Sequence, residues 1–274
     1  MTAAGVQRNW IDDSAGQDSP SQLIRSRRFA PPIELSVVIP TKNEARNIEW
    51  VLERLPESAD EVIVVDGTSV DDTVAVAQRV RPDVRIVMEH RPGKGAAIRA
   101  GFAAARGQYV VMIDADGSMD PAEIGRYVQL LSHGCDFVKG SRFRAGAGTS
   151  DMGFVRKQGN AALKQMVNVL YRTEFTDLCY GFMGFRRDKL GLLNLQSDGF
   201  EIETEIVVRA VKAGLRIGEV PSFESERRNG DSNLNAWRDG RRVLRTLLSE
   251  RWILPKTSVI EPVAAEALEG AVQA

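Results

Sequence analysis

Cysteine and histidine are scarce in this sequence of 274 residues, which contains two of each. The chain therefore has neither the Cys/His spacing of a zinc site nor the cysteine density of a disulfide-stabilised domain. Cys135 and Cys179 are predicted to be small buried residues of a protein from a reducing compartment. An excess of one charge is also missing, because the formal net charge is −1. Nucleic-acid-binding domains are usually basic, so we expect no nucleic-acid partner.

Long apolar runs are absent as well. No stretch approaches the ~18 apolar residues that a membrane span needs, and the N-terminus lacks the apolar segment of a secretory signal peptide. We therefore expect a cytoplasmic protein whose contacts with a membrane, at its inner face, are peripheral. The composition itself is ordinary for a globular protein, with 43% hydrophobic and 27% charged residues, and it supports a substantial core.

The composition changes along the chain and indicates one folded domain between two tails. Residues 1–32 are rich in Ser, Asp, Gln, Arg and Pro without apolar periodicity, and we predict a flexible tail there. Residues 256–274 are predicted to form a second tail. The domain at 33–255 is expected to comprise a nucleotide-binding half, 33–142, and an acceptor half, 143–255.

Strand-like and helix-like segments alternate in the first half of the domain. The predicted strands are 35–39, 61–66, 84–88, 109–114 and 135–139, and the predicted helices are 44–55, 71–80, 94–106 and 120–132. Continuous Val/Ile runs indicate strands buried on both faces of a parallel sheet. Repeated βαβ units predict a doubly wound α/β fold, which binds ligands at the carboxyl ends of its strands. In the second half we expect helices near 153–171, 201–213 and 234–250, and strands near 181–186 and 216–223.

Three polar clusters follow predicted strands, at residues 40–44, 66–73 and 114–118. All three should therefore converge on one edge of the sheet. Asp114 and Asp116 are two residues apart in an extended segment, so both carboxylates can point to the same side. Such a pair suits Mg²⁺ or Mn²⁺ beside a diphosphate. The alternative is a turn whose carboxylates cap a helix.

Two further features indicate a nucleotide site. Asp66, at the end of a predicted strand, is placed to accept hydrogen bonds from a base or ribose, although an Asp before Gly67 also suits a plain turn. Residues 91–95 form a basic, Gly-flanked turn before a predicted helix. A helix N-terminus of this kind is a natural anion site, and the alternative is an ordinary loop.

The order and spacing of these motifs resemble the inverting family 2 glycosyltransferases of the GT-A fold, and in particular the dolichol- or polyprenyl-phosphate hexosyltransferases. The matching stretches are 37–44, 65–73, 93–102, 114–116, 140–143, 177–186, 219–221 and 227–232. The resemblance implies a Rossmann-like, mostly parallel sheet flanked by helices. It also implies transfer of a hexose, with inversion, from a nucleotide-sugar such as GDP-mannose or UDP-glucose to a polyprenyl or dolichyl phosphate.

The resemblance also assigns roles to individual residues. Those implied to hold the nucleotide are Pro40, Thr41, Glu44, Asp66, Lys94, Asp114 and Ala115. Asp114 and Asp116 would bind Mg²⁺ or Mn²⁺, with Ser118 at the position that often supplies a third contact. Those implied to bind the acceptor phosphate are Arg142, Arg156, Asn160, Arg228 and Ser232. Asp116 and Arg142 are the implied catalytic residues.

Arg156 and Asn160 are four residues apart, which places them on one helix face. The alternative for the arginines is a solvated, salt-bridged surface.

Residues 201–205 contain three alternating carboxylates at the start of a predicted helix. If the acceptor is a hydroxyl, Glu203 is our candidate for the general base. The alternative is a helix N-terminus rich in acids, as the helix dipole favours. A glycosyltransferase with a saccharide or small-metabolite acceptor, and a non-catalytic nucleotide-binding scaffold, therefore remain as competing functions.

Residues 236–256 contain six basic residues, two acids and an apolar stripe of Val243, Leu244, Leu247 and Leu248. A basic amphipathic helix of this kind can lie in a membrane interface. The alternative is a helix packed on the domain. Relatives often continue into membrane-spanning helices beyond this point, so we expect either that a separate membrane protein presents the lipid or that the acceptor is soluble.

Overall fold

The structure is a computed structural model that describes residues 34–230 and 236–252. The two predicted tails and Ser232 lie outside the described residues.

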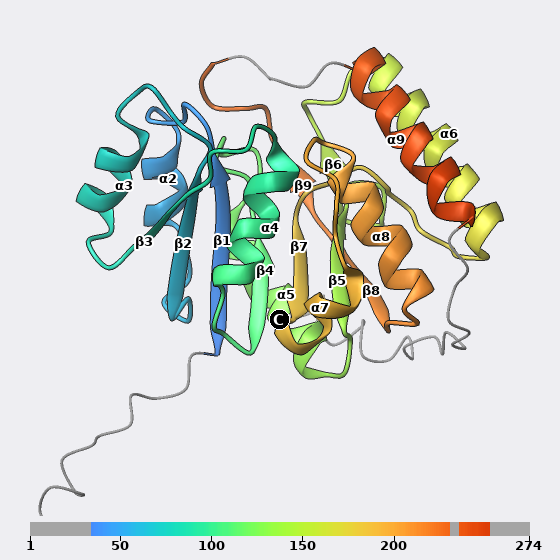
Figure 1. The fold of residues 1–274 in the computed structure, drawn as a ribbon, viewed down its shortest axis with the longest axis horizontal. Coiled ribbons are helices and arrows are strands. Elements are labelled where there is room, and N and C mark those ends of the chain that lie inside the picture. The colour runs from blue at the N-terminus through green and yellow to red at the C-terminus, as the bar shows by residue number, and fades with distance from the viewer. Residues whose placement is uncertain (1–33, 231–235, 253–274) are drawn as a thin grey trace, which may run out of the picture. The chain divides into compact units, whose positions relative to one another are not determined.

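A seven-stranded sheet with the order β3-β2-β1-β4-β7-β5-β8 forms the centre of the fold (Figure 1). Its strands are β1 (Leu35–Thr41), β2 (Glu61–Asp66), β3 (Arg85–Met88), β4 (Tyr109–Met112), β5 (Phe137–Ser141), β7 (Met183–Arg186) and β8 (Ile217–Pro221). Neighbouring strands are parallel except at β7, which runs antiparallel to β4 and β5. The predicted mostly parallel α/β sheet is therefore confirmed.

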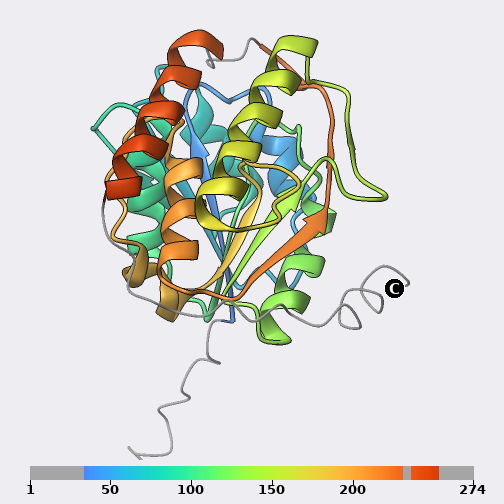
Figure 2. The same ribbon diagram turned by 90° about the vertical axis from the view of Figure 1, so that its right-hand side faces the viewer.

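Helices cover both faces of the sheet (Figures 1 and 2). One layer contains α4 (Lys94–Ala104), α6 (Phe154–Tyr171), α7 (Arg187–Leu193), α8 (Ile202–Lys212) and α9 (Ala236–Trp252). The other contains α2 (Ile48–Glu53), α3 (Thr73–Val80), the short 3-10 helix η1 (Pro121–Glu123) and α5 (Ile124–Ser132). Successive strand residues point to opposite faces, so Val38 packs under the first layer and Val37 and Ile39 under the second.

The chain reverses its direction of winding beside β1. β2 and β3 lie on one side of β1, and β4 begins the series on the other side. In such sheets a crevice opens at the carboxyl ends of the strands where the order reverses. The segments that leave β1 and β4 therefore meet there. Backbone hydrogen bonds fix both, from Gly67 to the carbonyl of Thr41 at 2.9 Å and from Ile113 to that of Val38 at 3.1 Å.

Three elements were not predicted from the sequence. The strands β6 (Gly148–Thr149) and β9 (Phe223–Glu224) pair in parallel as a separate two-stranded sheet. Helix α7 begins directly after β7 and spans seven residues, which is too short for a helical period to be recognised.

In helix α9, two of the four residues of the predicted apolar stripe are buried and two are exposed. Val243 and Leu247 are 5% and 0% exposed and pack into the core, whereas Leu244 and Leu248 are 36% and 50% exposed. Figure 2 shows α9, α8 and α6 side by side on one face of the sheet. Within the part of the chain that the structure describes, no helix is both long and apolar enough to cross a bilayer.

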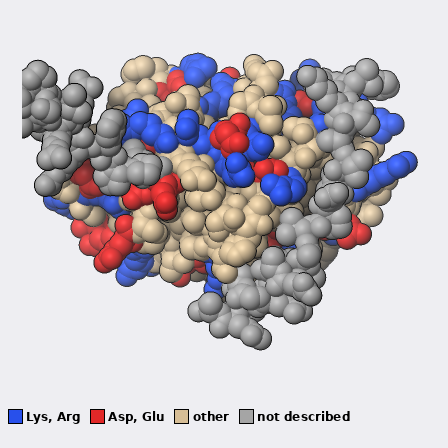
Figure 3. All heavy atoms as spheres, turned by 90° about the horizontal axis from the view of Figure 1, so that it is seen from below, with Lys and Arg blue, Asp and Glu red and all other residues tan. Residues whose placement is uncertain are grey.

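On the face of the molecule seen from below, acidic and basic side chains lie together around a broad area without charged side chains (Figure 3). This face is the one opposite the carboxyl ends of the parallel strands (Figure 1). Its mixed surface agrees with the near-zero net charge of the chain.

Candidate active site

A cavity of about 480 Å³ opens at the carboxyl ends of β1 and β4. Two of the predicted polar clusters, 40–44 and 114–118, contribute to its lining, and Gly67 is the contribution of the third. Helices α6, α8 and α9 supply further lining residues. The predicted convergence of the clusters on one edge is therefore confirmed.

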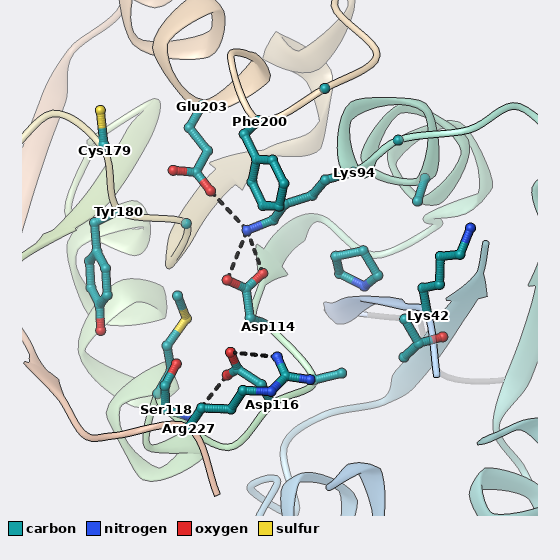
Figure 4. Close-up of a pocket in the computed structure, with 18 of the residues that line it drawn as sticks. Lys42, Lys94, Asp114, Asp116, Ser118, Cys179, Tyr180, Phe200, Glu203 and Arg227 are labelled. Atoms are coloured by element: carbon teal, nitrogen blue, oxygen red, sulfur yellow. Dashed lines mark hydrogen bonds and ion pairs between the residues drawn. The ribbon is translucent and has the colours of Figure 1, made fainter. Parts of the chain in front are cut away.

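Lys94, Asp114 and Glu203 form an ion cluster in the middle of the cavity (Figure 4). The ammonium nitrogen of Lys94 lies 2.7 Å from Oδ1 of Asp114 and 2.8 Å from Oε1 of Glu203. Burial, together with the charges of Asp116 and Glu203, raises the pKa of Asp114 to about 6, against the opposing effect of Lys94. Although burial lowers the pKa of Lys94, its two carboxylate partners outweigh that effect and the net shift is upward.

Gly181 has no side chain, and the cluster of Lys94, Asp114 and Glu203 occupies the space that a side chain at this position would need. A Cβ atom at this position would lie 2.9 Å from Oε1 of Glu203, 2.9 Å from Nζ of Lys94 and 3.2 Å from Oδ2 of Asp114. Cys179 lines the same side of the cavity. Burial and the charge of Glu203 raise the pKa of its thiol to about 12, so the thiol is protonated at neutral pH. Cys135 is buried as predicted.

Asp116 lies beside Arg227 at the lower edge of Figure 4. Nη1 of Arg227 is 3.3 Å from Oδ2 of Asp116, and Nη2 donates to Oε1 of Glu44. The neighbouring Arg228, which the resemblance implied for the acceptor phosphate, lies outside the cavity lining in this structure. Arg228 stacks on Trp50, with its Cζ 4.6 Å from the ring centroid, and does not line the cavity. A loop has no regular period in its sequence. The sequence therefore does not indicate which of these two adjacent side chains points into the cavity.

Asp66 is 1% exposed and lies at the end of β2. Its Oδ2 accepts a hydrogen bond from the backbone N–H of Ser69 at 2.9 Å. Its Oδ1 is buried and has no hydrogen-bond partner among the described residues. A buried acceptor without a partner costs free energy, so this oxygen is a candidate contact for a ligand. Asp66 itself lies behind the cavity lining, whereas the other predicted nucleotide residues are part of it: Pro40, Thr41, Glu44, Lys94, Asp114 and Ala115.

Arg142 lines the cavity, but its guanidinium group is held by the protein itself. Nε and Nη2 donate to the two carboxylate oxygens of Asp177 at 2.7 and 3.0 Å, Nη1 donates to both carboxylate oxygens of Glu224 at 3.1 Å, and Nη2 also donates to the carbonyl of Cys179. Although burial alone raises the pKa of Asp177, Arg142 outweighs it and the pKa lies below its ordinary value. A guanidinium has five N–H donors, and these contacts use all of them. Arg142 therefore ties β9 to the 177–179 loop.

Arg156 and Asn160 both lie on α6, four residues apart, but only Arg156 lines the cavity. Arg156, in the first turn of α6, lines the cavity and is 2.9 Å from Asp151. Asn160 is 6% exposed and does not line it. Its side chain donates to Asp177 at 3.0 Å and accepts from the backbone N–H of Cys179 at 3.1 Å. Asn160 is thus a support for the 177–179 loop, one helical turn below the cavity, rather than a cavity-lining phosphate ligand.

Two arginines of α9, Arg238 and Arg242, also line the cavity. Both belong to the basic helix for which the sequence left a membrane interface and packing on the domain as alternatives, and neither was among the predicted site residues. Their spacing of four residues puts them on one helix face, which is the signal that would have grouped them.

The basic turn at 91–95 contributes Lys94 and Gly93 to the cavity, but its helix end is not free for an anion. The backbone N–H groups of Gly95 and Ala96 donate to the carbonyl of Asp198 at 2.8 and 3.3 Å. A Cβ atom on Gly95 would lie 2.3 Å from the carbonyl oxygen of Ser197. The glycine is therefore required by the close approach of two backbones, and the expected anion site is replaced by a backbone cap.

The donor set at Asp114 and Asp116 fits a divalent cation that is completed by other ligands. No group of three or more Cys, His, Asp or Glu side chains able to hold a metal occurs among residues 34–230 and 236–252. Mg²⁺ in enzymes is usually bound by one or two carboxylates together with substrate phosphates and water. Two carboxylates that face one cavity and are balanced here by Lys94 and Arg227 satisfy that description.

Residues 36–192, more than half of the chain, match the family described as Glycosyl transferase family 2. The chain therefore belongs to this family, and it is a nucleotide-sugar-dependent glycosyltransferase with the GT-A fold, as its motifs predicted.

Individual relatives support the same family. The chain is 32% identical over 215 residues to glycosyltransferase AglJ of Haloferax volcanii, covering 76% of this chain and 69% of AglJ. It is 34% identical over 203 residues to the uncharacterized glycosyltransferase Rv0539 of Mycobacterium tuberculosis, covering 73% and 89%. A similar solved structure is glucosyl-3-phosphoglycerate synthase of M. tuberculosis with Mn²⁺, UDP and phosphoglyceric acid. Its TM-score is 0.63 at 25% identity, covering 82% of this chain and 81% of that one.

Proposed function

We propose that this protein transfers a hexosyl group, with inversion, from a nucleotide-sugar of the GDP-mannose or UDP-glucose type to a polyprenyl or dolichyl phosphate. The observation that carries the proposal is the distribution of charge around the cavity. The segments after β1 and β4 and helix α8 contribute four carboxylates. Three cations line the same cavity: Lys42 after β1, Lys94 at the start of α4 and Arg227 after β9. Helices α6 and α9 contribute arginines. The first group suits a dication with a diphosphate, and the second suits an acceptor phosphate.

The nucleotide would lie against the segments that leave β1, β2 and β4. The unpaired Oδ1 of Asp66 supports this position, because an N–H group of a nucleobase would satisfy it. Thr41 and Ala115 would approach the ribose and phosphates from the cavity lining.

Mg²⁺ or Mn²⁺ held by Asp114 and Asp116 would stabilise the negative charge of the departing nucleoside diphosphate. The solved relative that contains Mn²⁺ and UDP supports a cation at such a site. Lys94 and Arg227 neutralise the two carboxylates in this structure. With a donor bound, both side chains are within the same cavity and are available to donate hydrogen bonds to diphosphate oxygens.

The acceptor phosphate is already an anion at neutral pH, so its reaction requires no general base. One phosphate oxygen attacks C1 of the hexose, and the bond from C1 to the diphosphate breaks with its electron pair leaving on the nucleoside diphosphate. The protein contributes orientation and charge stabilisation. Arg156 would hold the attacking phosphate, and Arg142 would act indirectly by fixing the loop that carries Cys179.

A second candidate acceptor is a hydroxyl on a small phosphorylated molecule. Glu203 faces the cavity with one oxygen on Lys94 and the other turned toward Cys179 and Tyr180 (Figure 4). A carboxylate in this position could take the proton of an attacking hydroxyl. The relative crystallised with phosphoglyceric acid favours this alternative.

A lipid acceptor also requires contact with a membrane surface, and we propose a peripheral contact through the outer face of α9. Leu244 and Leu248 are exposed there, and Arg251, three residues beyond Leu248, is exposed on the same helix. Basic and apolar side chains together favour binding to anionic lipid surfaces.

The test is transfer from UDP-glucose and GDP-mannose, with Mn²⁺, to a short polyprenyl phosphate or to phosphoglycerate, with the products weighed by mass spectrometry. We expect a hexosyl polyprenyl phosphate. Arg156→Ala should reduce its formation strongly, whereas Glu203→Gln should reduce it less. A product with phosphoglycerate alone, lost in Glu203→Gln, would replace the first proposal with the second.

A further inference from the structure

Arg238 and Arg242 place two guanidinium groups on one face of α9, and both line the cavity that contains Asp114 and Asp116. Arg241 and Arg245 on the same helix do not line it. The rotation of α9 about its axis is fixed by its packing, because Val243 and Leu247 are buried in the core. At the far end of the helix, Glu250 accepts hydrogen bonds from Arg209 and Lys212 of α8 at 2.8 and 2.7 Å. The inward direction of this arginine pair is therefore a property of the fold.

The arginines of α6 and α9 give this part of the cavity side chains that bind anions. The arginines from α6 and α9 are Arg156, Arg238 and Arg242, and the carboxylate that lines the cavity beside them is Asp151. Asp239 lies at the base of the α9 pair, 3.4 Å from Nε of Arg238 and 3.7 Å from Nη1 of Arg242. Asp239 is 3% exposed, so its carboxylate is held in place by the fold and helps to orient the two arginine side chains. Guanidinium groups of two helices thus line one cavity, where an anionic ligand would meet them.

The side chains themselves are accessible to that ligand. Those of Arg238 and Arg242 are 61% and 51% exposed, and that of Arg156 is 31% exposed. Arg142, in contrast, is 2% exposed and already makes five donor contacts. The planar fork of a guanidinium binds phosphate oxygens in pairs, so a phosphate group matches these side chains better than a neutral sugar.

We propose that Arg238 and Arg242 of α9, together with Arg156 of α6, form the binding site for the phosphate monoester of the acceptor. This inference rests on the proposed function, because it gives the acceptor phosphate its place in the cavity. It also makes α9 part of the catalytic domain's ligand-binding surface. The chemistry is the same whether the monoester is a polyprenyl phosphate or a phosphorylated small molecule.

The experiment compares matched arginines on one helix. Arg238→Gln and Arg242→Gln, the inward variants, remove guanidinium groups that line the cavity. Arg241→Gln and Arg245→Gln, the outward variants, remove exposed guanidinium groups that do not line it, with the same change of net charge. We expect each inward variant to raise the acceptor KM about tenfold to hundredfold, the loss expected of a charged hydrogen bond. The outward variants should stay within twofold when the acceptor is a short polyprenyl phosphate in detergent or phosphoglycerate. The Kd for UDP or GDP with Mg²⁺, from calorimetry, should not change in any of the four.

Direct binding separates this proposal from the proposed transfer reaction. Inorganic phosphate is titrated into the full chain with saturating UDP and Mg²⁺, and its affinity is measured for the wild type and the four variants. Binding that is lost in Arg242→Gln and kept in Arg241→Gln supports the site even if neither acceptor is glycosylated. Equal losses in inward and outward variants, a parallel loss of nucleotide affinity, or no phosphate binding by the wild type would overturn it.

Discussion

The carboxylates of the cavity each have a cation of the protein as a partner. Lys94 balances Asp114 and Glu203, and Arg227 balances Asp116 and Glu44. Breaking a buried ion pair by removing one partner is costly, because the other charge remains without compensation. A substitution that keeps both partners but displaces them slightly avoids this cost. It should alter activity more than it alters stability.

Gly181 tests this expectation at one residue. Gly181→Ala would place a methyl group within 3.2 Å of three charged atoms of the Lys94 cluster. We expect kcat to fall about tenfold to hundredfold, because displacement of catalytic groups by about 1 Å has effects of this size. Steady-state kinetics and the melting temperature check it together. Gly159→Ala, at a position on α6 with no atom within 4 Å of the new Cβ, is the control. It should keep full activity and gain about 0.5–1 kcal/mol of stability.

Asp66 gives a second prediction at the same scale. If its unpaired oxygen binds the nucleobase, Asp66→Ala should weaken UDP or GDP binding about tenfold to hundredfold. Calorimetry in the presence of Mg²⁺ measures the effect. Asp72→Ala is the control, because the side chain of Asp72 is exposed and makes no helix-capping hydrogen bond. An unchanged affinity in Asp66→Ala would place the base elsewhere.

The sequence identified the inward residues well wherever a strand fixed their direction. Pro40, Thr41, Asp114 and Asp116 follow apolar strands, and all four line the cavity. The sequence was a weaker guide to the cavity-lining residues in loops and beyond the first turn of a helix. Arg227 and Arg228 are adjacent in a loop and point in different directions. The choice between them depends on Trp50, a contact distant in sequence.

At the scale of elements, the parallel strands β1 to β4 were predictable because each contains adjacent Val or Ile residues. The orientation of β7 was not, because its pairing with β4 and β5 leaves no pattern in the segment 183–186 itself. The two-residue strands β6 and β9 are also too short to carry a period. They form where Arg142 and Thr149 bind Glu224.

The contact between α8 and α9 predicts a pH effect. Although burial of Glu250 raises its pKa, its hydrogen bonds with Lys212 and Arg209 outweigh burial and hold the pKa below its ordinary value. A depressed pKa in the folded state gives stability that is present above the unfolded pKa, about 4.5, and is lost as pH falls through the folded value. Glu250→Gln should therefore lower the free energy of unfolding by about 1–3 kcal/mol at pH 7.

Urea unfolding at several pH values measures this effect. The difference between the wild type and Glu250→Gln should shrink progressively below pH 4.5. The control, Glu53→Gln, removes an exposed partner of Arg54 and should change stability by no more than about 0.5 kcal/mol. A gap between wild type and Glu250→Gln that is constant with pH would contradict the assignment.

For the whole molecule, ligand binding should appear as resistance to heat. A nucleotide at a hundred times its Kd stabilises a folded protein by about 2.7 kcal/mol, which corresponds to a rise of about 5–10 °C in melting temperature for a chain of this size. We expect UDP or GDP to produce this rise with Mn²⁺ and a much smaller one with EDTA. Asp114→Asn should abolish the dependence on Mn²⁺. A rise that is equal in Mn²⁺ and in EDTA would show that the two aspartates do not bind the cation.

The reversed strand has a consequence for where along the chain the molecule is vulnerable. A strand that runs toward the ligand delivers its functional residues after it ends, as β1, β4, β5 and β8 do with Glu44, Asp114, Arg142 and Arg227. β7 runs away from the ligand, so its functional residues, Cys179 to Gly181, come before it begins. An insertion directly after β1, β4, β5 or β8 is therefore expected to be more harmful than one before the same strand. At β7 the insertion before the strand is expected to be the more harmful one.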